Sequence, residues 1–187
     1  MAARLGAGSA KPAPRRLAAL LAALIAGAQG PAAAQATARQ ETVARSGAQV
    51  MPFSLAATIH VFTKTADGGT QRVLARQPQD AGQVIQIRAH LRELQRQFTQ
   101  RDFSAPERIH GAGMPGLAQL RQAPPAALAI DYREIEAGAQ LRYTTTDPQL
   151  RAALHAWFDA QLADHGHDAV AGHDPAHAAM AHAARQP

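Results

Sequence analysis

The sequence contains no cysteine, and aromatic residues make up only 4% of its 187 residues. Without cysteine the chain can form no disulfide, no thiolate zinc site and no cysteine nucleophile. Its length suits a single domain with tails and leaves no space for a large multidomain enzyme. The sequence also lacks a G-x-S-x-G turn, a phosphate-binding loop and a dinucleotide fingerprint. These absences favour a protein that is not an enzyme.

The net charge of +5 is concentrated near the N-terminus. Basic residues without acidic ones precede an apolar run at 17–28, and an A-Q-A cleavage motif lies at 34–36. This pattern predicts a secretory signal peptide over residues 1–36, and therefore a periplasmic or secreted protein. The apolar run is shorter than the ~20 residues of a spanning helix, so we expect no stable membrane insertion after cleavage. The remaining chain is close to neutral with interspersed charges, so we expect no nucleic-acid binding.

Two stretches of the remaining chain are typical of β-hairpins. Apolar and polar residues alternate from about Leu55 to Phe62, turn residues follow at 66–69, and an extended segment at 70–76 completes the first hairpin. Similar alternation at 128–132 and 141–145 predicts the second.

Each hairpin is followed by a segment with a helical pattern. Asp80 is placed to cap a helix that runs to about Arg101, and Asp147-Pro148 is placed to begin another that closes near Gly166. In the first helix the apolar residues fall on one stripe, at Val84, Ile87, Leu91, Leu94 and Phe98. We therefore expect an α+β fold in which an antiparallel sheet is made from two β-hairpins, each followed by a helix (ββα-ββα), with the helices on one face.

The segments on either side of this domain lack a hydrophobic period. Residues 37–49 are polar and rich in small residues, which indicates a flexible leader. Residues 50–166 form the single α+β domain, and residues 167–187 are rich in His and Ala and indicate a mobile tail. More than half of the nine histidines lie near this end, at His165, His167, His173, His177 and His182. Such a tail could capture metal ions weakly, or it could be a solvated segment without function.

A second group of residues points more specifically to metal chemistry. His110 and Met114 flank a glycine-rich loop, His155 and Asp159 are spaced i and i+4 on the last predicted helix, and His165 ends that helix. Imidazole binds copper and zinc, and a thioether nearby favours copper. We therefore expect a copper or zinc site whose ligands are His110, Met114, His155, Asp159 and His165, with Asp159 as ligand or as a residue that orients a ligand. The alternative is that His155 and Asp159 form a surface pair and His110 caps a turn.

Several short motifs resemble a family of small, uncharacterised secreted bacterial proteins. They are MPF at 51–53, HVFTKTADGG at 60–69, IHG at 109–111, MPGL at 114–117, WFDAQ at 157–161 and DHG at 164–166. The resemblance covers about residues 50–166 and implies the same fold and compartment. Some members carry the label aspartate carbamoyltransferase, an activity that we do not expect here. That enzyme is a larger, two-domain cytosolic protein with a Ser-Thr-Arg-Thr loop, which this sequence lacks.

The sequence thus favours an exported protein that binds copper or zinc. One alternative is an interaction module of the cell envelope that uses the open sheet face or edge to bind a protein partner. Another is a small hydrolase or transferase in which His110, His155 or Asp159 acts as an acid or base.

Overall fold

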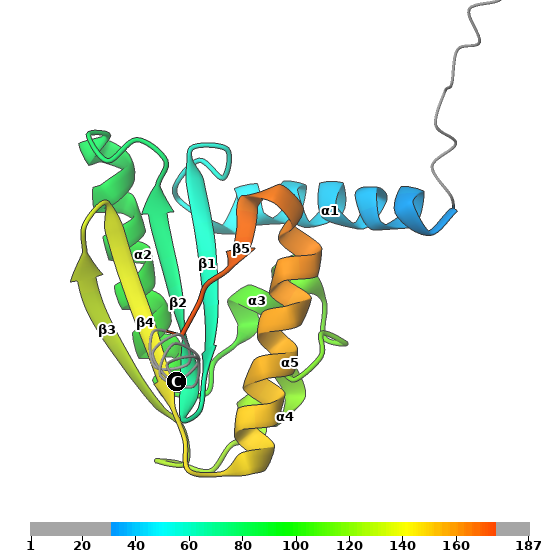
Figure 1. The fold of residues 1–187 in the computed structure, drawn as a ribbon, viewed down its shortest axis with the longest axis vertical. Coiled ribbons are helices and arrows are strands. Elements are labelled where there is room, and N and C mark those ends of the chain that lie inside the picture. Colours follow the sequence, from blue (N-terminus) through cyan, green and yellow to red (C-terminus); the bar gives the residue numbers. More distant parts are fainter. Residues whose placement is uncertain (1–30, 175–187) are drawn as a thin grey trace, which may run out of the picture.

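The structure, a computed structural model, describes residues 31–174 (Figure 1). The predicted signal peptide lies mostly outside these residues, and so does the tail after residue 174. The elements in chain order are α1 (Pro31–Val50), β1 (Thr58–Thr65), β2 (Gly68–Ala75), α2 (Ala81–Thr99), α3 (Ser104–His110), α4 (Leu117–Gln122), β3 (Ala129–Ile135), β4 (Gly138–Thr144), α5 (Pro148–His165), a 3-10 turn (Gly166–Asp168) and β5 (Ala169–Ala171).

The strands form one sheet in the order β3-β4-β2-β1-β5. Both predicted hairpins are present, β1 with β2 and β3 with β4, and antiparallel pairing of β2 with β4 joins them. The predicted α+β class is confirmed. The expectation of a purely antiparallel sheet is wrong, because β5 pairs parallel with β1 after the chain has crossed over through α5. The element order is also longer than two hairpin–helix units, since α1, α3, α4 and β5 are added to them.

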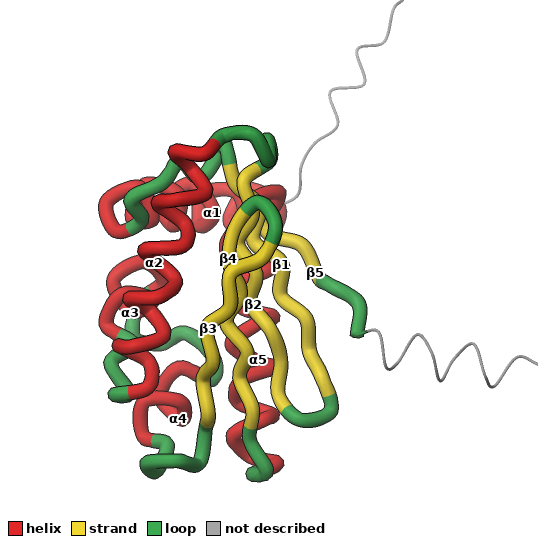
Figure 2. Tube along the Cα trace, turned by 90° about the vertical axis from the view of Figure 1, so that its left-hand side faces the viewer, coloured by secondary structure: helices red, strands yellow, loops and turns green. Residues whose placement is uncertain are grey.

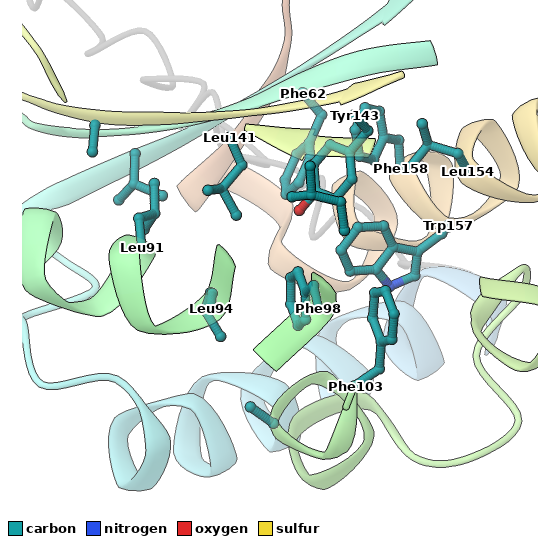
Figure 3. Packing of buried hydrophobic residues seen from close by; sticks show 14 of the residues in the cluster. Phe62, Leu91, Leu94, Phe98, Phe103, Leu141, Tyr143, Leu154, Trp157 and Phe158 are labelled. Atoms are coloured by element: carbon teal, nitrogen blue, oxygen red, sulfur yellow. The ribbon is translucent and has the colours of Figure 1, made fainter. Parts of the chain in front are cut away.

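The two long helices begin at the predicted caps. The Asp80 carboxylate accepts a hydrogen bond from the backbone N–H of Gln83, and the Asp147 carboxylate accepts from the N–H groups of Gln149 and Leu150. The apolar stripe of α2 is buried as predicted. Both helices pack on the same face of the sheet: Figure 2 shows α2 beside this face, and Figure 3 shows side chains of α2 and α5 that meet next to the strands.

Aromatic side chains join α5 to the sheet and to the end of α2 (Figure 3). Trp157 contacts the rings of Phe98 and Tyr143 edge-on, with ring centroids 6.1 and 6.0 Å apart. Phe158 contacts Phe62 of β1 at 5.2 Å. These contacts hold the C-terminal half of α5 against the centre of the sheet, where the candidate site lies.

Helix α1 occupies the segment that the sequence indicated as a flexible leader. It contacts α3 and α5, and its Val43 is fully buried. Gln40 donates a hydrogen bond to the backbone carbonyl of Ala163, and Arg39 forms an ion pair with Asp164. The position of α1 therefore depends on a few long-range contacts. Such contacts do not require a regular spacing of hydrophobic residues, so the sequence of this segment lacks the pattern of an amphipathic helix. The motif at 34–36 lies within this helix.

The start of the predicted mobile tail is also ordered by pairing. Strand β5 places Ala169 opposite His60 and Ala171 opposite Phe62. Because β5 begins soon after α5 ends, this pairing brings His165 close to His60.

The other face of the sheet carries polar side chains over β2, β3 and β4 and an apolar strip over β1, β2 and β5, made of Ile59, Val61, Leu74 and Val170. Alternate residues of β2, β3 and β4 point away from the helices, among them Arg72, Asp131, Gln140 and Arg142. The large hydrophobic side chains exposed within residues 31–174 are Ile85 and Val170. Within the same residues, no helix has the length and apolar character that crossing a membrane requires.

Candidate functional site: a buried imidazole cluster

In the structure, three of the five predicted metal ligands contact other groups. The Nε2 atom of His155 lies 2.8 Å from the backbone carbonyl oxygen of Gly68, and Asp159 forms an ion pair with Lys64. Met114 is buried in the hydrophobic core. These residues therefore do not gather around one point, and the i, i+4 spacing of His155 and Asp159 reflects separate contacts with the first hairpin.

The other two predicted ligands, His110 and His165, come together with His60. The His165 ring stacks on His60, with centroids 5.2 Å apart and planes inclined by 7°. It meets the His110 ring edge-on at 5.0 Å. The exposed fractions of His60, His110 and His165 are 3%, 4% and 7%. We call His60, His110 and His165 the imidazole cluster.

Three different elements supply the cluster. His60 comes from β1, His110 ends α3 and His165 ends α5. The chain after His110 can approach α5 closely because Gly116 has a φ of 76° and no side chain. A Cβ there would lie 2.0 Å from the backbone carbonyl oxygen of Ala153 in α5. His60 was not among the predicted ligands, although it alternates with Phe62 along β1 and both residues are buried.

His110 and His165 each have one ring nitrogen beside an acceptor. His110 Nδ1 lies 2.8 Å from the Asp164 carboxylate, and His165 Nε2 lies 3.1 Å from the side-chain oxygen of Gln161. For His60, an interaction with the backbone of Asp168 partly opposes the lowering of its pKa by burial, and its Nδ1 is buried without a partner among the described residues. An acceptor fixes the proton on the nitrogen that faces it. The second nitrogen of His110 and of His165, Nε2 and Nδ1 respectively, then carries a lone pair in the neutral ring.

Burial keeps these rings neutral. It lowers the pKa of His60 to about 4 and that of His165 to about 2, and neighbouring histidines lower both further. Burial also lowers the pKa of His110, although the Asp164 carboxylate partly opposes this effect. All three side chains therefore bear free lone pairs at neutral pH.

Asp164 is itself held by α1. The Arg39 Nε atom donates to one carboxylate oxygen at 2.9 Å, and a terminal nitrogen of Arg39 donates to the other at 2.6 Å. That nitrogen also donates to the backbone carbonyl of His110 at 2.7 Å. Burial alone would raise the pKa of Asp164, but the hydrogen bonds from Arg39 and His110 hold it below its usual value. Asp164 is therefore a paired carboxylate that orients His110.

The cluster lines a cavity of about 30 Å³. This is the space of a single water molecule or ion, and it is too small for an organic substrate. His90, Met51, Gln71 and Trp157 also line the cavity. The indole Nε1 of Trp157 is buried without a partner among the described residues. Within residues 31–174, no three His, Asp or Glu side chains already surround a point where a metal ion could be held.

A larger pocket of about 230 Å³ reaches the cluster from outside. It shares His165 with the inner cavity and is also lined by Glu41 of α1, Asp164 of α5 and Asp168 of the 3-10 turn. His165 therefore lies between a carboxylate-lined opening and the buried rings.

No protein family, curated protein or solved structure matches the chain. The resemblance to small secreted bacterial proteins stays a prediction, and the functional argument depends on the site alone.

Proposed function

We propose that this chain is an exported metal-binding protein that holds one copper or zinc ion between His60, His110 and His165. The observation that carries the proposal is the pairing pattern of the three buried rings. Two of the rings have one nitrogen that faces an acceptor, and the third, His60, has an Nδ1 that is buried without a partner among the described residues. The export part of the proposal rests on the signal peptide predicted at residues 1–36.

The chemistry of the rings supports a metal ion. Neutral imidazole is the commonest side-chain ligand, and metal-bound histidines usually donate their other N–H to a carboxylate or carbonyl oxygen. The contacts of His110 with Asp164 and of His165 with Gln161 follow this pattern. An unpaired polar atom as buried as His60 Nδ1 costs free energy unless a ligand compensates it. An ion in the cavity would provide that compensation.

Binding requires the rings to turn, because their free nitrogens do not yet surround one point. The cavity gives space for this movement, and the acceptors at Asp164, Gln161 and the Asp168 backbone would act as pivots. The outer pocket, in which Asp164 pairs with Arg39 and Asp168 with Arg76 while Glu41 is exposed, would lead an ion to His165. The ligand set of this proposal keeps His110 and His165 and adds His60 in place of Met114, His155 and Asp159.

The two other candidate functions have weaker support. A hydrolase using His110, His155 and Asp159 would need these groups in one pocket, whereas His155 contacts Gly68 and Asp159 pairs with Lys64. An interaction module that uses the open sheet face would favour a large exposed apolar patch, whereas Val170 is the large hydrophobic side chain exposed on that face among the described residues.

A titration with zinc and copper tests the proposal. The reference protein is the full chain in which the tail histidines are replaced by alanine, His173→Ala, His177→Ala and His182→Ala. We expect it to bind one ion, and His60→Phe and His110→Asn to weaken binding by at least about tenfold, as loss of a metal contact does. Phenylalanine retains the ring stacking of His60, and asparagine retains a donor toward Asp164.

His155→Gln is the matched control, because it changes a histidine outside the cluster and keeps a donor toward Gly68. Its affinity should equal that of the reference protein. Equal affinities for His60→Phe, His110→Asn and the control, with all variants folded, would show that the imidazole cluster is not the site.

A further inference from the structure

We infer that the imidazole cluster is adapted to Cu(I) rather than Zn(II), and that the thioether of Met51 completes its ligand set. This inference rests on the proposed function and adds to it the identity of the ion and a fourth ligand. It is carried by the charge of the cavity lining, by the oxygen atoms around it and by the position of Met51.

The lining of the cavity has no negative charge. Among the described residues, no Asp or Glu lines the cavity. The nearest carboxylate in the hydrogen-bond network, Asp164, is neutralised by two hydrogen bonds from Arg39. Transfer of an ion from water to an apolar interior costs free energy that increases with the square of its charge. Neutral imidazoles leave the charge of the ion uncompensated, so this cost is smaller for a monovalent ion than for a divalent one.

The oxygen atoms that could complete a zinc site are already engaged. Zinc takes four ligands in nearly all protein sites, so three imidazoles leave one position for an oxygen, nitrogen or thiolate. The side-chain oxygen of Gln161 faces His165, and that of Gln71 accepts a hydrogen bond of 2.9 Å from the Tyr143 hydroxyl. A water molecule could take this position only by sharing the cavity of about 30 Å³ with the ion and the imidazole rings.

Met51 offers a soft ligand instead. It follows α1 directly, its N–H donates to the carbonyl of Gly47 at 2.8 Å, and its half-buried side chain lines the cavity. Thioether sulfur binds Cu(I) and contributes little to zinc sites. Met51 would thus stabilise Cu(I) selectively, while His60, His110 and His165 would bind either ion.

Competition titrations with chromophoric chelators test this inference in the full chain lacking the tail histidines. Cu(I) is kept reduced with ascorbate under anaerobic conditions, and Zn(II) is titrated separately. We expect Met51→Leu to lower the affinity for Cu(I) by at least about tenfold and that for Zn(II) by less than about twofold. Leucine keeps the size and apolar character of methionine, so the fold should be unaffected. X-ray absorption at the copper edge should detect one sulfur neighbour in the unsubstituted protein and none in the variant.

Met114→Leu is the matched control, because Met114 is buried elsewhere and does not line this cavity. It should leave both affinities unchanged. The inference would be overturned if Met51→Leu and Met114→Leu changed the affinity for Cu(I) equally, or if Met51→Leu lowered the affinities for Cu(I) and Zn(II) equally. In either case His60→Phe would still weaken binding, so the proposed function would stand. If His60→Phe weakened neither ion, the proposed function itself would fail.

Discussion

His60 is the least exposed member of the imidazole cluster, and its ring is nearly parallel to those of Phe62 and His165. It is 3% exposed, and its Nδ1 has no partner among the described residues. A buried polar atom of this kind lowers the stability of the metal-free fold. We therefore interpret His60 as part of a site that a bound ligand would complete.

One prediction at this scale concerns acid. The pKa of His60 is about 4 in the folded protein, against about 6.5 for an unfolded chain. Between these values the unfolded state binds a proton that the folded state excludes. The free energy of unfolding of the metal-free protein should therefore fall as the pH falls from about 6.5 toward 4, with a contribution of about 3 kcal/mol from His60. The facing groups His90, His110 and His165 also have lowered pKa values, so they steepen the same loss.

Urea unfolding at a series of pH values, with a chelator present, measures this effect. His60→Phe should show a shallower loss of stability in this pH range than the unsubstituted protein. If the free energy of unfolding had the same pH dependence in the two proteins, this result would contradict the conclusion that His60 is a buried, neutral imidazole.

Helix α1 is the element that connects the site to the surface. Arg39 binds Asp164 and the backbone of His110, and Val43 packs into the domain. The Arg39 side chain is partly exposed, so solvent weakens this ion pair. The contact with Asp164 nevertheless fixes both the position of α1 and the orientation of His110.

We expect Arg39→Gln to loosen α1. Loss of the ion pair should lower the local stability of α1 by about 1 kcal/mol, seen as faster hydrogen exchange over Pro31–Val50 without change in α2. Arg45→Gln is the control, because Arg45 lies on the same helix and bonds Thr42 within it. Equal exchange in the two variants would show that Arg39 does not anchor the helix.

At the scale of the whole molecule, local patterns in the sequence predicted much of the fold. The alternation near Phe62 and the caps at Asp80 and Asp147 are set by neighbouring residues, so both hairpins and both long helices were foreseen. Helix α1 and strand β5 were not, because each depends on contacts with distant residues such as Asp164 and His60.

The residues of the candidate site, like the elements of the fold, were predicted from the sequence only in part. Sequence spacing selected His110 and His165 but could not show that β5 brings His165 next to His60. The same spacing suggested that His155 and Asp159 act together, whereas in the structure His155 contacts Gly68 and Asp159 pairs with Lys64. A metal site made of distant residues becomes visible only when the chain is folded.

The most direct test of the imidazole cluster is to identify the nitrogen atoms that bind the ion. Long-range ¹H–¹⁵N spectra of the labelled full chain, recorded during titration with Zn(II) or Cu(I), report both nitrogens of every histidine. The account predicts ligand-type shifts at His60 Nδ1, His110 Nε2 and His165 Nδ1, while their other nitrogens remain protonated. Shifts confined to His173, His177 and His182, with the three buried rings unchanged, would contradict it.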